Sequence, residues 1–170
     1  MPKLIPMSTL LDPRYRKKTI YFDMDGTLAD LYGVRPKVID GQTLNVFQRL
    51  DMNDARVYDE AAPISSNVRM LKELKRRGYR IGIITAGSRF PPGTSFSIQA
   101  KMNSDTQRYK RQWLARNGIV VDEFKFVPYG TPKMNAASDR NGILVDDETK
   151  VLNNWPGLCV FANPKNAARF

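Results

Sequence analysis

One short stretch, Thr19 to Asp30, most constrains what this chain can fold into. It begins with Thr-Ile-Tyr-Phe, a run of β-branched and aromatic residues, and Gly26 follows within a few positions. Such a run, bounded by a turn residue, is typical of a buried strand that opens into a loop. If the chain stays extended through Asp23 and Asp25, their side chains point the same way, because side-chain direction alternates along a strand. The stretch therefore predicts two carboxylates in one site at the end of a strand.

These carboxylates and the residues after them suit a metal ion and a phosphate group. Two close carboxylates repel each other, so both stay ionised only beside a cation, and hard oxygen ligands suit Mg²⁺. Gly26 permits a sharp turn that brings backbone N–H groups near an anion, and Thr27 adds a supporting hydroxyl. The alternative is a strand end with two solvated acids, which the demanding Asp-x-Asp-Gly-Thr pattern disfavours.

The run Asp23-Met24-Asp25-Gly26-Thr27 after an apolar strand resembles the first motif of the haloacid dehalogenase (HAD) superfamily. Most members of that family are Mg²⁺-dependent phosphohydrolases. The resemblance implies that Asp23 is a nucleophile that forms an aspartyl-phosphate and that Asp25 is the general acid and base. An aspartate can attack phosphorus once a metal offsets the repulsion between anions, and Asp25 can protonate the leaving oxygen and later deprotonate water.

A second apolar strand, expected over Arg80 to Thr85, resembles the second HAD motif, which ends in Ser or Thr. A helix expected over about residues 65–77 separates it from the first strand, so the order predicts a parallel, right-handed crossover. Thr85 then stands at the carboxyl end of a strand, where ligands bind in open α/β sheets. The resemblance implies that its hydroxyl and the N–H of Ala86 hold phosphoryl oxygens.

A further pair of aspartates, Asp146 and Asp147, follows the apolar run that begins at Gly142 and resembles the fourth HAD motif. The resemblance implies that Asp146 completes a Mg²⁺ site with the Asp23 carboxylate and the main-chain carbonyl of Asp25. Asp147 is then expected to support the metal ligands or hold a water molecule. The residues alone do not decide which of the two touches the metal.

A lysine shortly before the fourth motif matches the third motif of the family. The resemblance implies that Lys133, in the loop before that strand, neutralises the phosphate and orients Asp23. One lysine among 27 basic residues is a weak signal by itself. Three other lysines are candidates for the same role: Lys101, Lys110 and Lys125.

Residues 31–63 interrupt what would otherwise be a direct strand-to-helix connection, so we expect a small helical cap inserted after the first strand. A weak helical pattern runs through Leu44, Phe47 and Leu50. Many HAD enzymes place a cap here, where it excludes water and contacts the leaving group. Aromatic residues at helical spacing are more often core, but three are candidates for stacking on a base or ring: Tyr32, Phe47 and Tyr58.

These segments predict a three-layer α/β/α sandwich, the Rossmann-like HAD fold, with a mainly parallel sheet and the first-motif strand at its centre. Residues 16–30 and 64–170 are expected to form the core domain and residues 31–63 the cap. Residues 1–15, which contain three prolines, are expected to form a flexible arm. We also expect an irregular stretch over 89–104, a helix over 105–118, and strands over 123–128 and 158–162.

Composition narrows the function classes. The chain has no histidine, which excludes Ser-His-Asp and Cys-His catalysis and histidine-ligated zinc. Its single cysteine, Cys159, lies in an apolar run and is expected to be a buried structural thiol. With no apolar run of transmembrane length and no signal-peptide pattern, a cytoplasmic protein with no membrane partner is expected. The formal charge of +10 favours anionic partners such as nucleotides or nucleic acid without choosing among them.

The substrate is inferred from a narrower resemblance. The segment from Asp25 to Tyr32, the run from Tyr58 to Pro63, and Val-Pro-Tyr-Gly before Lys133 look similar to 5′-nucleotidases of the deoxyribonucleotidase type, including small bacteriophage-encoded members. This implies a nucleoside monophosphate substrate, although the short cap and the Ala-Gly pair after Thr85 depart from that pattern.

Two alternatives stay open. One is a phosphatase acting on nucleic-acid termini, which the positive charge and a small cap favour. The other is a non-catalytic nucleic-acid-binding protein on a HAD shell, which the intact set of motif residues disfavours. The sequence does not determine the oligomeric state.

Overall fold

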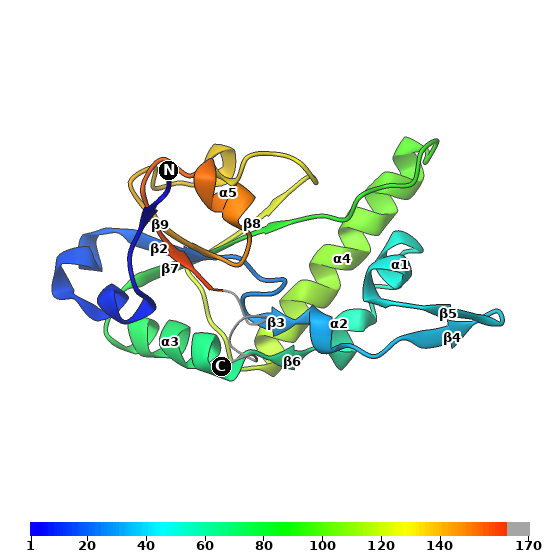
Figure 1. The fold of residues 1–170 in the computed structure, drawn as a ribbon, viewed down its shortest axis with the longest axis horizontal. Helices are drawn as coiled ribbons and strands as arrows, with labels where there is room; N and C mark the ends of the chain where they lie inside the picture. Colours follow the sequence, from blue (N-terminus) through cyan, green and yellow to red (C-terminus); the bar gives the residue numbers. More distant parts are fainter. Residues whose placement is uncertain (163–170) are drawn as a thin grey trace.

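A six-stranded parallel sheet, in the order β1-β10-β9-β2-β7-β8, forms the centre of the molecule (Figure 1). The computed structural model describes residues 1–162. The strands are β1 (Lys3–Leu4), β2 (Thr19–Phe22), β7 (Arg80–Ala86), β8 (Glu123–Val127), β9 (Ile143–Asp146) and β10 (Leu158–Phe161). Every pairing between neighbouring strands is parallel. The predicted parallel α/β sheet with the first-motif strand inside it is confirmed.

Strand β2 lies between β7 and β9, and all four of its residues are buried. Ile20 lies opposite Ile81 on one side and Ile143 on the other. A parallel strand that is buried on both faces needs apolar side chains on both, so its sequence does not alternate between apolar and polar residues. Because the strands are parallel, the carboxyl ends of β2, β7 and β9 lie at one edge of the sheet.

Helices cover both faces of the sheet, which makes three layers. One core joins Ile20 and Phe22 to α3 (Ser65–Arg76) and to the C-terminal half of α4 (Phe96–Arg116). The opposite face joins Tyr21 to α5 (Thr149–Asn153), and Cys159 is buried there as expected. Within residues 1–162, no helix has both the length and the apolar character needed to cross a membrane.

Two glycines make room for the Tyr21 ring on this second face. A Cβ atom at Gly82 would lie 2.6 Å from Tyr21 Cδ1, and one at Gly142 would lie 2.7 Å from Tyr21 Cε2. The Tyr21 hydroxyl accepts a hydrogen bond from the Asp139 N–H at 2.8 Å, and the ring meets the edge of Trp155 at 5.9 Å between centroids. Glycine at these two positions therefore lets the ring pack against β7 on one side and against the start of β9 on the other.

Residues 31–63 leave and rejoin the core side by side, because β3 (Ala29–Asp30) pairs antiparallel with β6 (Ala62–Pro63). Between them come η3 (Leu31–Gly33), a hairpin of β4 (Lys37–Ile39) and β5 (Gln42–Leu44), and the short helices α1 (Val46–Asp51) and α2 (Val57–Glu60). Figure 1 shows that this insertion lies to one side of the sheet, next to α4. Its action as a cap stays a prediction.

The N-terminal segment packs on the core instead of forming the flexible arm expected from its prolines. Strand β1 pairs with β10, and two 3-10 helices follow, η1 (Met7–Leu11) and η2 (Pro13–Lys17). Leu10 is fully buried, and the Tyr79 hydroxyl donates to the Asp12 carbonyl at 2.9 Å. Such short turns bury single side chains and leave no helical periodicity in the sequence.

The irregular stretch expected over 89–104 is confirmed for residues 89–95 and wrong for the rest, because α4 begins at Phe96 and continues to Arg116. Ser95 caps the helix by accepting a hydrogen bond from the Ile98 N–H. Phe96 and Ile98 are 89% and 53% exposed, so the first turns carry no apolar face that periodicity could detect.

The other expected elements differ by one or two residues at their ends. The final part of the expected core domain, residues 163–170, lies outside the described residues.

Candidate active site

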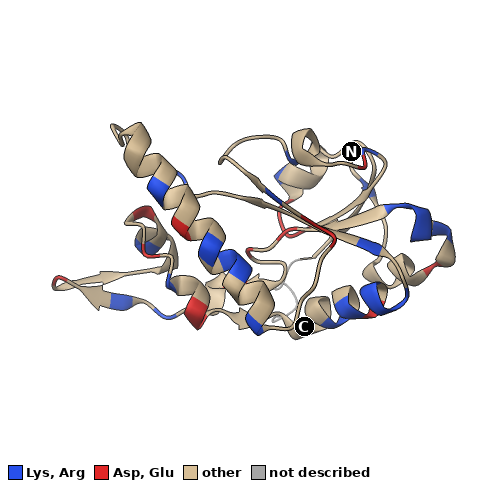
Figure 2. Ribbon diagram, turned by 180° about the vertical axis from the view of Figure 1, so that it is seen from behind, with Lys and Arg blue, Asp and Glu red and all other residues tan. Residues whose placement is uncertain are grey.

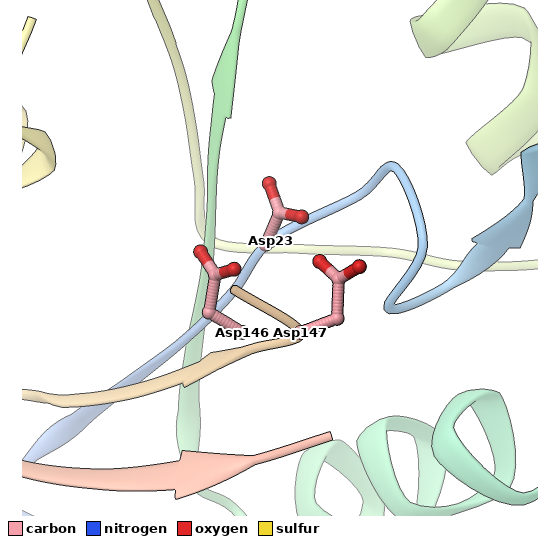
Figure 3. Close-up of side chains that lie close together, drawn as sticks. All are labelled: Asp23, Asp146 and Asp147. Carbon is pink, nitrogen blue, oxygen red and sulfur yellow. The ribbon is translucent and has the colours of Figure 1, made fainter. Parts of the chain in front are cut away.

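Three carboxylates meet where β2 and β9 end (Figure 3). Asp23, Asp146 and Asp147 each offer an oxygen that lies within 4.8 Å of the others. The Asp23 N–H donates to the Val145 carbonyl at 2.9 Å, which joins the end of β2 to β9. Two stretches that the sequence separates by more than a hundred residues therefore supply one acidic cluster.

Lys133 lies between two of these carboxylates. It begins η4 (Lys133–Ala136), and its Nζ donates to Asp23 Oδ1 at 2.6 Å and to Asp146 Oδ2 at 2.7 Å. The side chain is buried, so this ammonium is the nearest counter-charge to both acids. Of the other candidate lysines, Lys101 pairs with Asp105, and within residues 1–162 neither it nor Lys125 lines the cavity described below.

Burial and mutual repulsion set the ionisation of the cluster. Burial, together with the charges of Asp146 and Asp25, raises the pKa of Asp23 to about 7 even though Lys133 opposes the shift. Burial and the charges of Asp23 and Asp146 raise the pKa of Asp147 to about 8. Burial alone would lower the pKa of Lys133, but Asp23 and Asp146 more than offset it and the pKa is raised. The three carboxylates of the cluster therefore have one ammonium group beside them, that of Lys133, which cannot neutralise all three.

The donor set fits a divalent cation. Three converging carboxylates offer hard oxygen ligands and an excess of negative charge, which is what Mg²⁺ requires. Gly26 allows Asp147 to come this close, since a Cβ atom there would lie 2.3 Å from Asp147 Oδ2, and its φ of +82° also favours glycine.

The turn after Asp25 differs from the anion cradle expected there. The Gly26 N–H donates to the Ala29 carbonyl at 2.9 Å, and the Thr27 N–H donates to the Met24 carbonyl. These two N–H groups close the loop on itself, so the glycine serves the approach of Asp147 instead. The buried Thr27 hydroxyl oxygen has no hydrogen-bond partner among the described residues.

Asp25 has a different setting from Asp23. Its Oδ2 accepts hydrogen bonds from the Tyr58 hydroxyl at 2.9 Å and from Lys110 Nζ at 3.1 Å. Its Oδ1 is buried and has no partner within residues 1–162. Burial, followed by the charge of Asp25, raises the pKa of Tyr58 well above its ordinary value, so this tyrosine acts only as a neutral donor.

Lys110 was predicted only as a substitute for Lys133, and the structure gives it separate contacts. Besides Asp25, it donates to Thr85 Oγ1 at 2.5 Å and to the Ala86 carbonyl at 2.9 Å. The sequence holds one signal for this position, because Lys110 falls at helical spacing between the buried residues Thr106 and Trp113. A lysine in the apolar stripe of a helix requires a buried partner.

A cavity of about 570 Å³ opens over the site. The buried and partly buried residues that line it form its floor and include Asp23, Asp25, Lys133, Asp146 and Ala86. The exposed residues that line it form its outer wall and mouth and include aromatic and basic side chains, namely Tyr32, Phe47, Tyr129, Arg89 and Lys150. The rings of Tyr32 and Phe47 lie 5.6 Å apart between centroids.

Two predicted contact residues lie behind this cavity. Tyr58 is buried against Asp25, so the structure places it beside the acid instead of at the mouth, where Tyr32 and Phe47 lie. Thr85 is fully buried, with its hydroxyl against Lys110. Direct contact of Thr85 with a phosphoryl group stays a prediction.

Comparison with solved structures places the chain in a known fold. It superposes on a chain of the Pnkp1/Rnl/Hen1 complex with a TM-score of 0.57 at 17% identity, covering 86% of this chain and 46% of the other. A second structure of that RNA repair complex gives 0.55 at 17% identity and covers 86% and 43%. A D,D-heptose 1,7-bisphosphate phosphatase from B. bronchiseptica, solved with magnesium and phosphate, gives 0.46 at 16% identity and covers 90% and 87%.

The chain spans less than half the length of the two RNA-repair chains that it matches. No model of a known protein family matches it, and no curated protein does. At these identities the likeness is one of fold. The chain therefore adopts a Rossmann-like α/β fold, with its acidic cluster and cavity at the carboxyl edge of the sheet.

Proposed function

We propose that this protein is a Mg²⁺-dependent phosphomonoester hydrolase that works through an aspartyl-phosphate on Asp23. One observation carries the proposal: the carboxylates of Asp23 and Asp25 line the same cavity but have different neighbouring groups. Asp23 lies among acids and Lys133, as a metal-assisted nucleophile requires, whereas the Asp25 carboxylate is outside the three-acid cluster and accepts hydrogen bonds from Tyr58 and Lys110. Pairs of carboxyl groups with such different surroundings are suited to different roles in one reaction.

In the first half-reaction, the Asp23 carboxylate attacks phosphorus, a P–O bond to Asp23 forms, and the bond to the leaving oxygen breaks. Asp25 gives its proton to that oxygen as the alcohol departs. In the second, water attacks the phosphorus, its proton passes to Asp25, the bond to Asp23 breaks, and inorganic phosphate leaves. Both aspartates then return to their starting states.

The proposed metal ligands are the carboxylates of Asp23 and Asp146 and the main-chain carbonyl of Asp25, with Asp147 beside them. A bound Mg²⁺ would offset the repulsion between the nucleophile and the anionic phosphate. Lys133 is placed to neutralise a further phosphoryl oxygen while it holds Asp23 in line. We assign the remaining phosphoryl contacts to Ala86, which lines the cavity, and to Thr85 behind it.

The proposed substrate is a nucleoside monophosphate, most simply a 5′-(deoxy)ribonucleotide. The cavity volume lies within the usual range for small-molecule sites, and Tyr32 and Phe47 at its mouth offer ring faces for a base. Both rings line the same cavity as Asp23 and are 40% and 47% exposed, so a base that stacks on them would lie toward solvent from the acids.

A second candidate is a phosphatase that acts on nucleic-acid termini. Its specific support is the outer wall of the cavity, where Arg89 and Lys150 accompany the 60% exposed ring of Tyr129. Exposed rings and cations of this kind bind single strands by stacking and by contacts to the phosphate backbone. A similar fold occurs in an RNA repair complex, which supports including nucleic-acid ends among the test substrates.

The deciding experiment is phosphate release from nucleoside 5′-monophosphates, nucleoside 3′-monophosphates, sugar phosphates and 3′-phosphorylated oligonucleotides, with Mg²⁺ and with a chelator. Asp23→Asn serves as the blank, because it keeps the shape of the site but removes the nucleophile. We expect metal-dependent release that is highest for mononucleotides.

Preference for oligonucleotide ends would favour the second candidate. A folded wild-type protein that releases no phosphate above the Asp23→Asn blank from any of these substrates would refute the hydrolase proposal. Binding of DNA or RNA that survives Asp23→Asn and weakens steeply with salt would then point to a non-catalytic nucleic-acid-binding protein.

A further inference from the structure

Lys110 is a fully buried lysine whose charge the proposed reaction does not yet use. It projects from α4, and its ammonium donates to Asp25 Oδ2, Thr85 Oγ1 and the Ala86 carbonyl. An ammonium has three N–H groups, so these partners occupy all of them. Within the described residues, Lys110 does not line the cavity, whereas Lys133 does. Lys110 therefore cannot serve as a direct phosphate contact in this arrangement.

Stability alone gives little reason for a charge at this position. Burying an ammonium costs free energy, and replacing a buried ion pair by well-packed apolar side chains is often neutral or stabilising. The neighbours of the Lys110 ammonium include the rings of Tyr58 and Phe126, at 5.5 and 5.9 Å from Nζ to the centroids, so an apolar side chain would have suitable surroundings. The hydrogen bonds from Lys110 to Asp25 and to the end of β7 supply another reason for a charged side chain here.

The two donors to Asp25 belong to one packed unit. Tyr58 lies on α2, and α2 is joined to α4 by a hydrogen bond from Arg116 to the Tyr58 carbonyl at 2.8 Å. Nearby, Trp113 Nε1 donates to the Ala61 carbonyl at 2.9 Å. Lys110 and Tyr58 thus reach the same carboxylate oxygen from two elements whose relative position is fixed.

The geometry points to Lys110 as a positioning residue that, with Tyr58, holds the Asp25 carboxylate in one orientation and ties it to the end of β7. This inference rests on the proposed function, in which Asp25 exchanges a proton with the leaving oxygen and with water. An acid that must reach a particular oxygen gains from a fixed orientation, because a misplacement of about 1 Å can cost roughly 100-fold in rate. The ammonium supplies that orientation from behind the site.

The test compares Lys110→Met with the matched control Lys101→Met, which removes the same charge from an exposed position on the same helix. Two substrates separate the effects. One is a nucleoside 5′-monophosphate, or the 3′-phosphorylated oligonucleotide if the panel above favours it, whose alcohol must be protonated as it leaves. The other is p-nitrophenyl phosphate, whose nitrophenolate leaves without a proton, followed in the first turnover.

We expect Lys110→Met to lower kcat for the alcohol-releasing substrate by about 100-fold, within the range of general acid–base catalysis, with KM changed by less than about threefold. First-turnover release of nitrophenolate should fall by less than about tenfold, because that step does not need the acid. Lys101→Met should match the wild type on both substrates. A loss confined to the substrate that needs the acid is a result that general loosening of the structure would not produce.

Equal losses on both substrates, or none on either, would overturn the inference while leaving the hydrolase proposal intact. If Lys110→Met does not fold, the charge-balanced double variant Lys110→Met/Asp25→Asn replaces it and is compared with Asp25→Asn. We expect equal rates from these two, because Lys110 acts through Asp25, and a further large loss in the double variant would overturn the assignment. A folded wild-type protein that is inactive on both substrates would refute the proposed function and this inference with it.

Discussion

Asp23 and Asp147 are acids whose ionisation in the folded protein opposes its stability when no metal is bound. Burial is the main cause that raises the pKa of Asp23 to about 7 and that of Asp147 to about 8, from an ordinary value of 3.8. Between about pH 4 and pH 8 the folded chain therefore holds more protons at these sites than the unfolded chain does. In this window the free energy of unfolding falls as the pH rises.

We predict that Tm, measured by circular dichroism in EDTA, falls by several degrees between pH 5.5 and pH 8, since about 1 kcal/mol corresponds to roughly 2–4 °C for a chain of this size. Added Mg²⁺ should reduce the fall, because it favours the ionised acids. Asp147→Asn should reduce it too, whereas Asp40→Asn, in an exposed turn, should leave it unchanged. A Tm that rises with pH in EDTA would contradict these pKa directions.

The sequence predicted the acidic residues better than their partners. Asp23 and Asp146 follow apolar strands, and the rule that parallel strands end at one edge brings them together, while Asp25 lines the same cavity. Lys110 and Tyr58 reach Asp25 from two separate helices, and only the packing of those helices decides that contact. For that reason periodicity could place both residues on buried faces but could not assign their partner.

At the scale of elements, the insertion is held together by a buried charge. Arg49 on α1 is fully buried, and it pairs with Asp54 in the connection and with Glu60 on α2. Hydrogen bonding to Glu60 raises the pKa of Arg49 despite burial, so the guanidinium stays charged. This network fixes α1 against α2, the helix that carries Tyr58.

We predict that Arg49→Met lowers the free energy of unfolding, measured by urea titration, by about 3 kcal/mol, because it leaves buried Asp54 with little compensation. Arg56→Met is the matched control, since Arg56 pairs with the same Asp54 from a side chain that is 63% exposed. The control should cost less than about 1 kcal/mol. Equal costs for the two variants would show that the buried network does not stabilise the insertion.

Helix α4 shows why some elements could not be read from the sequence. Its second half has buried residues at helical spacing, and the sequence predicted a helix there. Its first half projects from the core with Phe96 and Ile98 exposed, so no apolar stripe marks it. The N-terminal segment has the opposite character, since it buries Leu10 through short turns that have no period.

At the scale of the whole molecule, the charge of +10 is spread over many elements. Figure 2 shows Lys and Arg along α3, along α4 and in the N-terminal segment, with acids between them. Several of these bases are already paired, as Arg76 and Arg77 are with Glu73. The net charge therefore attracts anions in general, while Arg89 and Lys150 are the bases at the mouth of the cavity.

We predict that Arg89→Glu lowers kcat/KM for the best substrate by about tenfold at low salt, whereas Lys72→Glu on α3 changes it by less than about twofold. Both substitutions change the net charge by the same amount, but among the described residues Arg89 lines the cavity and Lys72 does not, and salt at 0.1 M screens charges that lie beyond about 10 Å. Steady-state kinetics at several NaCl concentrations would measure this, and the effect of Arg89→Glu should shrink as salt increases. Equal effects of the two variants would mean that overall charge, not the mouth of the cavity, attracts the substrate.

The order of strands in the sheet also bears on how the protein is made. Lys3 in β1 lies opposite Leu158 in β10. Strand β2 pairs with β7 and β9, which both come much later in the sequence. A ribosome releases β1 first among these strands and β10 last, so the sheet cannot close in the order of synthesis. Such distant pairings form slowly, because a long segment of chain must be ordered before they are made. During translation the acids of β2 and β9 stay apart until nearly all of the sheet has emerged, and a partly made chain has no assembled site.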